Sequence, residues 1–148
     1  MIIGILRTLL VSVGIACLTN YALEAIGSRY LLDFLKANII NIQIGLLAIN
    51  TATLGVVLTK LRDLVDKGVP LEKFSSARRE MLLSVKEQVA LIIAVIVILS
   101  LDGATLLKSI VPSGLLHILL LSCFAYALMV LYDTAKSVFV VLGDSSES

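Results

Sequence analysis

The chain has 148 residues, of which 59% are hydrophobic and only 16% are charged, and its mean hydropathy is +1.04. Soluble domains of this size are less apolar and carry about 25% charged residues, so the composition predicts an integral membrane protein and excludes an ordinary soluble domain. The net charge is +1, close to zero, so nothing suggests a nucleic-acid partner.

Four stretches are long and apolar enough to cross a membrane, which requires roughly 20 residues in a helix. They cover residues 5–26, 39–59, 88–107 and 115–132. Arg7 lies inside the first stretch, whereas a signal peptide carries its charge ahead of the apolar run, so we interpret this stretch as a retained span. The prediction is an all-α membrane bundle of four helices in one domain, residues 1–143, followed by a short disordered tail at 144–148.

The distribution of Lys and Arg predicts the orientation of the spans. Seven basic residues lie between the second and third spans, namely Lys60, Arg62, Lys67, Lys73, Arg78, Arg79 and Lys86. The connections on the opposite side carry only Arg29, Lys36 and Lys108. We therefore expect both termini in the cytoplasm, in a multi-pass protein of a bacterial inner membrane.

The second and third spans are expected to continue as helices beyond the membrane. Gly68 is a typical helix stop, and a return helix is expected to begin near Ser75 or Ser76. Apolar residues continue both spans at helical spacing, Leu58, Leu61 and Val65 in the second and Leu82, Val85 and Val89 in the third. Residues 60–87 should form a cytoplasmic helical hairpin. The fourth span should extend in the same way and end at Gly143.

Arg78 and Arg79 are expected to be the most exposed cationic pair of this hairpin. One interpretation is a solvated face that anchors the helices at the membrane. The other is a docking surface for a cytoplasmic protein partner. Membrane lipid is the other expected partner, although two arginines are fewer than the clusters typical of specific lipid recognition.

A stripe of small residues runs along the second span. Its members recur at steps of four, three, four and three, and they are Asn41, Gly45, Ala48, Ala52 and Gly55. Small residues allow two helix backbones to approach closely in a membrane, so this stripe predicts a helix-to-helix contact. The contact can lie within one chain or between copies, and we favour a homo-oligomer.

Gln43 and Asn50 lie on the opposite face of the same span. Their amides would be costly against lipid, so both should face protein or water, and the second span should be the central helix. Amide hydrogen bonds between helices are one interpretation. A water-filled path that Thr53 would also line is the other.

Asp102 interrupts the third apolar stretch. A central aspartate costs about 2.5–3.5 kcal/mol, and the ten Leu, Ile and Val residues between Val89 and Leu101 offset this at about 0.3–0.6 kcal/mol each. At 1.5 Å per residue, Asp102 should lie about 8 Å below the outer boundary. It is either a helix kink or water contact beside Gly103, or an ion or proton site with Gln43 or Asn50 as its neighbour.

Catalysis is not expected. The single histidine, His117, and the isolated Cys17 and Cys123 do not form the ligand set of a metal site, and no motif indicates a cofactor. Asp102-Gly103 and Tyr132-Asp133 resemble fragments of intramembrane aspartyl protease motifs. The two carboxylates should nevertheless be about 15 Å apart, too far to share a proton or a water molecule.

Two hypotheses about function follow from these patterns. The first is a non-enzymatic, homo-oligomeric membrane subunit, a scaffold or sensor that anchors or signals to a cytoplasmic partner through the hairpin. The alternative is a small ion channel or proton-coupled transporter that uses Asp102 and the polar face of the second span.

Overall fold

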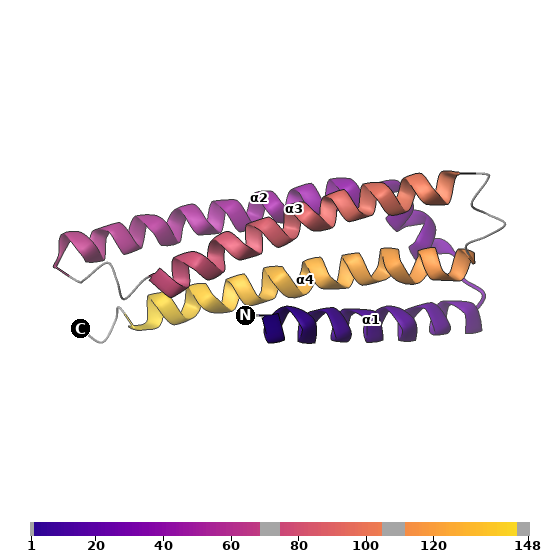
Figure 1. Cartoon of the computed structure of the whole chain (residues 1–148), viewed down its shortest axis with the longest axis horizontal. Coiled ribbons are helices and arrows are strands. Elements are labelled where there is room, and N and C mark those ends of the chain that lie inside the picture. The colour runs from indigo at the N-terminus through magenta and orange to yellow at the C-terminus, as the bar shows by residue number, and fades with distance from the viewer. Residues whose placement is uncertain (1, 69–74, 105–111, 145–148) are drawn as a thin grey trace.

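The computed structural model describes residues 2–68, 75–104 and 112–144, and this part of the chain forms a bundle of four helices (Figure 1). They are α1 (Ile2–Ala25), α2 (Tyr30–Asp66), α3 (Ser75–Gly103) and α4 (Ser113–Asp144). All four are long and apolar enough to cross a membrane. The prediction of an all-helical, four-span protein is therefore confirmed at this level.

Two of the predicted helix boundaries are found where the sequence places them. α2 ends just before Gly68, whose φ of +93° lies in the left-handed region that glycine adopts without strain, and whose N–H donates to the Val65 carbonyl at 2.9 Å. α3 begins at Ser75. α4 continues one residue past Gly143. Lys108 and the predicted tail from residue 145 onward lie outside the described residues.

α2 begins at Tyr30, well before the predicted start of its span at residue 39. The added segment contains Asp33 and Lys36, which lower its hydropathy but do not oppose a helix, and Asp33 stands in the first turn, where a negative charge is favourable. Hydropathy therefore located the apolar part of this helix and not its beginning.

The helices differ in length, and this shapes the two ends of the bundle. α2 has 37 residues and α1 has 24, which correspond to about 55 Å and 36 Å at 1.5 Å per residue, against a hydrocarbon core of about 30 Å. Figure 1 shows α1 beside α4. The start of α1 does not reach the end of the bundle at which α2 ends, α3 begins and α4 ends. We call that far end, where α2 leads to α3, the hairpin end, and the opposite end the turn end.

α4 is the central helix, because it packs against each of the other three, whereas α1 packs mainly against α4. The expectation that the second span would be central is wrong. Small side chains explain the difference, since they let backbones approach closely. On α1, Ser12, Ala16 and Asn20 follow one another at steps of four and are all buried, and the Ser12 hydroxyl lies 3.5 Å from Met129 Sδ of α4.

The apolar core consists of two clusters. The larger joins all four helices toward the turn end, and its buried members are Ala16, Leu32, Leu35, Ile39, Val95, Ile98, Leu116, Leu120 and Leu121. The smaller joins α2 to α3 toward the hairpin end through Leu54, Val57, Leu61 and Met81. The hairpin is thus held together by its own apolar contacts.

The face that closes the hairpin matches only part of what spacing predicts, since Leu61 belongs to it and Val85 packs against it. Leu61 and Met81 are buried in it, whereas Leu58, Leu82 and Val89 are exposed. Apolar residues surround both helices here, and hydropathy does not distinguish a leucine that faces a helix from one that faces lipid. Spacing alone therefore identified part of the contact face and did not separate it from the exposed face.

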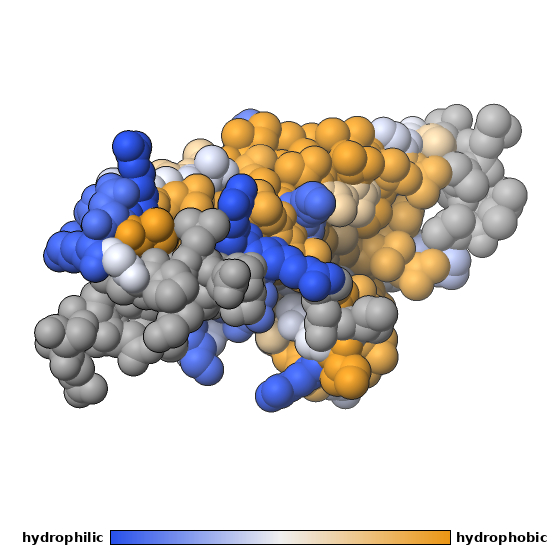
Figure 2. Space-filling view, turned by 60° about the vertical axis from the view of Figure 1, so that its left-hand side comes forward, coloured by the Kyte–Doolittle hydropathy of each residue, from blue (hydrophilic) through white to orange (hydrophobic). Residues whose placement is uncertain are grey.

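The surface is divided between apolar and hydrophilic parts. Figure 2 shows hydrophobic side chains over the middle of the molecule and hydrophilic ones gathered toward the hairpin end. α1 illustrates the apolar part, because Ile3, Leu10 and Leu18 are more than 60% exposed. Such a surface suits lipid and not water, which agrees with the four apolar helices.

Ala16→Leu is expected to weaken the contact between α1 and α4. Ala16 is 1% exposed, so a larger side chain must push the two helices apart, and overpacking of this kind costs about 1–3 kcal/mol. The matched control is Ala22→Leu, on the same helix at an exposed position. Unfolding of the purified protein by a denaturing detergent, followed by circular dichroism, measures both. Equal stabilities of the two variants would contradict the packing of α1.

Candidate functional site

Three amide side chains lie inside the bundle. Gln43, Asn50 and Gln88 are 2%, 0% and 2% exposed. The Asn50 Nδ2 group donates to Gln88 Oε1 at 3.1 Å and to Ser84 Oγ at 3.2 Å, so α2 and α3 share a polar contact in their buried interface. Gln43 and Asn50 thus lie on the inner face of α2, where protein surrounds them.

Four polar atoms of these amides have no hydrogen-bond partner among the described residues. They are Gln43 Nε2, Gln43 Oε1, Asn50 Oδ1 and Gln88 Nε2. Two of them are donors and two are acceptors, and each costs several kcal/mol when left unpaired in an apolar medium. These atoms leave both donors and acceptors available inside the bundle.

A polar pair that the sequence does not predict lies beside these amides. Glu87 of α3 hydrogen-bonds with Tyr126 of α4, and Asp133 lies within electrostatic range of both. Tyr126 is 7% exposed. The predicted third span began at Gln88, which left Glu87 just outside it. No local signal links residues 87 and 126, because only the packing of α3 on α4 brings them together.

Asp102 forms an ion pair with Lys36 of α2, at 2.8 Å between Oδ2 and Nζ. The expectation of a Gln43 or Asn50 neighbour is therefore wrong. The antiparallel register explains why. Asn50 contacts Gln88, so moving 14 residues along each helix places Lys36 beside Asp102.

The ion pair shows how Asp102 is accommodated. The two side chains are 30% and 27% exposed, so the pair stands near the turn end with partial access to the surroundings. A lysine partner removes the need to place an isolated carboxylate in an apolar medium. Asp102 therefore has a structural explanation that does not require an ion or proton site.

The structure keeps Asp102 and Asp133 apart. Asp102 stands beside Lys36, whereas Asp133 stands near Glu87, which is about 22 Å along α3 from Asp102 at 1.5 Å per residue. The two aspartates thus lie at different levels of the bundle. Cys17 and Cys123 are free thiols, and no group of three or more His, Cys, Asp or Glu side chains gathers in the described part of the chain.

The stripe of small residues lies on the outer face of α2. All five members, Asn41, Gly45, Ala48, Ala52 and Gly55, are exposed. A Cβ atom added at Gly45 or Gly55 would meet no atom within 4 Å. The stripe therefore makes no close helix contact with the described residues, and the close approach that small residues permit is not used among them.

Arg78 and Arg79 are exposed near the start of α3, at the hairpin end. Neither arginine forms an ion pair within the residues that the structure describes. Their guanidinium groups thus carry charge at the surface without an internal structural role.

Comparison of the chain with protein-family models, with curated proteins and with solved structures finds no match. Three features of the chain itself bear on its function, namely the exposed stripe of α2, the buried amides and the charged ends of the bundle.

Proposed function

We propose that the protein is a non-enzymatic membrane subunit that assembles with copies of itself through the outer face of α2 and presents its hairpin to a cytoplasmic protein. The observation that carries the proposal is the exposure of the entire small-residue stripe. A face built for close helix contact, left without one in the chain, is expected to find its partner in a second copy.

Asn41 strengthens this argument. Its side chain is exposed on the stripe and has no hydrogen-bond partner among the described residues. An amide facing hydrocarbon is costly, whereas one facing the same amide of a neighbouring copy can donate and accept. A contact around a two-fold axis would bring the stripe of each copy onto that of the other.

The position of α1 leaves this face accessible. α1 packs mainly against α4, so it does not cover the outer face of α2. The stripe extends over 15 residues, and its ends lie about 21 Å apart at 1.5 Å per residue, which is long enough for a helix-to-helix contact through much of a membrane.

Gly45→Leu combined with Gly55→Leu is expected to reduce self-association by about tenfold or more, because the added side chains hold the backbones apart. The folded monomer should tolerate them, since a Cβ at either position meets no atom within 4 Å. The control is Gly14→Leu on α1, which is equally open. Sedimentation in detergent over a range of concentrations measures the oligomer. A monomeric wild-type protein, or an unchanged double variant, would reject the α2 interface.

The hairpin supplies the surface for the partner. α2 is far longer than a membrane requires, and the apolar cluster of Leu54, Val57, Leu61 and Met81 ties it to α3 toward the hairpin end. The basic residues of this connection favour a cytoplasmic location by the positive-inside rule. In that orientation Arg78 and Arg79 would face the cytoplasm, where an acidic protein surface could pair with them.

Reversal of both charges, Arg78→Glu with Arg79→Glu, is expected to abolish co-purification of a cytoplasmic protein and leave the oligomer intact. The control is Arg7→Glu with Lys136→Glu, which changes the net charge equally at exposed positions of α1 and α4. Affinity purification of the full chain from cells, with quantitative mass spectrometry, compares them. Equal recovery of the partner from both variants would remove this surface from the proposal.

A second candidate function is conduction of protons or ions through each chain. The unpartnered atoms of Gln43, Asn50 and Gln88 favour it, because water held there would be a polar path inside the bundle. Asp102, the residue first considered for this role, would act through its ion pair with Lys36 at the turn end.

Asn50→Leu is expected to abolish any flux across liposomes that contain the purified protein, because it removes the amide that joins α2 to α3. Asn41→Leu is the control, since it removes the same amide group from the outer face of the same helix. A pH-sensitive or ion-sensitive dye inside the liposomes reports the flux. Absence of flux in the wild-type protein, or its persistence in Asn50→Leu, would exclude conduction by this route.

A further inference from the structure

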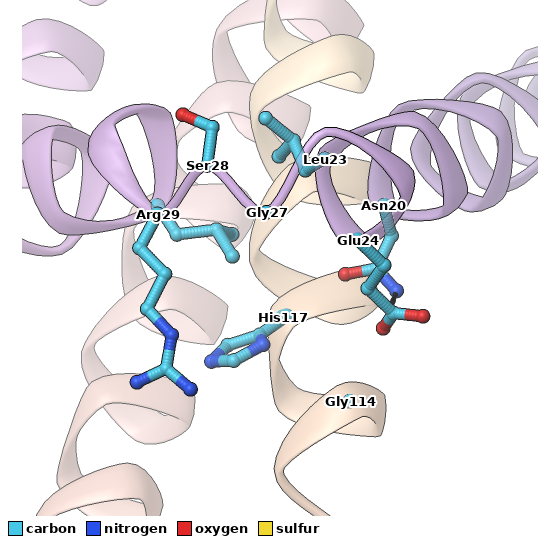
Figure 3. A pocket seen from close by; sticks show the side chains of 9 residues that line it. Asn20, Leu23, Glu24, Gly27, Ser28, Arg29, Gly114 and His117 are labelled. Atoms are coloured by element: carbon cyan, nitrogen blue, oxygen red, sulfur yellow. Dashed lines mark hydrogen bonds between the residues drawn. The ribbon is translucent and has the colours of Figure 1, made fainter.

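A pocket of about 400 Å³ opens at the turn end, where the end of α1 meets the beginnings of α2 and α4 (Figure 3). Its polar lining comes from Asn20, Glu24, Ser28, Arg29 and His117, and Leu23 and Leu32 add apolar walls. In Figure 3, Arg29 lies on one side of His117, and Glu24 lies with Asn20 on the other. The pocket therefore has a basic side and an acidic side.

The two opposite charges of the pocket are not paired with each other. Neither Glu24 nor Arg29 takes part in an ion pair within the described residues, although both line the same space. Asn20 is 7% exposed and donates to Glu24 Oε1 at 2.8 Å, which fixes the carboxylate without neutralising it. Separated opposite charges around one cavity suit a ligand that carries both an anionic and a cationic group.

The helix ends add to the same separation. α2 and α4 both begin at the pocket, and Arg29 at the N-cap of α2 makes no side-chain capping bond, so first-turn N–H groups of α2 stay available. Helix N-termini attract anions, and the guanidinium of Arg29 stands at the same place. α1 ends at Ala25 beside Glu24, and a helix C-terminus favours a cation.

We propose that this pocket binds the headgroup of a phospholipid that carries a phosphate and a primary ammonium, the chemistry of phosphoethanolamine. Arg29, His117 and the start of α2 take the phosphate. Glu24, held by Asn20, takes the ammonium. The proposal is independent of self-association and of the cytoplasmic partner.

The position of the pocket favours a lipid over a free solute. It lies at the end of the bundle that also holds the Lys36–Asp102 ion pair, and Tyr21 and Tyr30 are exposed on either side of the connection from α1 to α2. Exposed tyrosines are typical of the level of lipid headgroups. Below them, Leu18 and Phe34 expose apolar side chains along which acyl chains can lie.

The test is a lipid titration of the full chain in detergent, followed by native mass spectrometry. Phosphatidylethanolamine, phosphatidylcholine and phosphatidylglycerol of matched acyl chains are compared. Phosphatidylethanolamine should bind about tenfold more tightly than either, because the choline headgroup has no N–H to donate to Glu24 and the glycerol headgroup has no cation. Comparable binding of all three lipids would overturn the proposal.

Two variants assign the two sides of the pocket. Glu24→Gln should remove the preference for phosphatidylethanolamine over phosphatidylglycerol, whereas Arg29→Gln should weaken both by about tenfold. Glu80→Gln and Arg79→Gln, exposed at the hairpin end, are the matched controls and should change neither. A wild-type preference that survives in both pocket variants would place the lipid elsewhere and reject this site.

Soluble phosphoethanolamine separates the two sources of the headgroup. At the lipid's own binding concentration it should not displace phosphatidylethanolamine, because the acyl chains contribute part of the affinity through their contact with apolar helix surface. Displacement at equal concentration would show a site for a free small molecule and would overturn the lipid assignment. The comparison of the three lipids and the displacement by phosphoethanolamine both use the wild-type protein. They therefore test the proposal even where a variant fails to fold.

Discussion

The antiparallel register of α2 against α3 is the constraint on which the polar interior depends. Two polar contacts separated by the same number of residues on both helices define it, Asn50 with Gln88 and Lys36 with Asp102. A shift of one residue would break both at once, leaving two buried amides without these partners and separating the carboxylate of Asp102 from the ammonium of Lys36. Apolar packing alone does not specify a register so strictly, because leucine and isoleucine on adjacent turns are interchangeable in volume.

Much of the fold could be predicted from the sequence, since it depends on properties that are local. Hydropathy identifies four helices, and Gly68 marks a helix end because its left-handed φ suits glycine. The arrangement of those helices could not be predicted in the same way. In a chain this apolar, Leu58 and Leu61 have the same hydropathy, yet one is exposed and the other is buried. The choice depends on which helix lies opposite, and that is a long-range property.

The candidate site also combines features that depend on local sequence with features that depend on packing between helices. Gln43 and Asn50 can be predicted to face inward because an amide in contact with lipid is costly. This prediction needs only the sequence of α2. Their partners do not follow, because Ser84 and Gln88 come from α3, and Lys36 reaches Asp102 only through the register. The contact of Glu87 with Tyr126 is the hardest to predict from the sequence, since it depends on how α4 packs against α3.

The central position of α4 links the interior to the outer surface. Because α1 is held by α4 through the row of Ser12, Ala16 and Asn20, α2 is left with an inner face of amides and an outer face of small residues. The inner face is covered within the chain. The outer face combines exposed glycines with the exposed amide of Asn41, a composition that gains little from lipid and more from another helix. The described residues thus cover the amide face of α2 and leave its small-residue face exposed, and that exposed face is the one on which the proposed contact between copies depends.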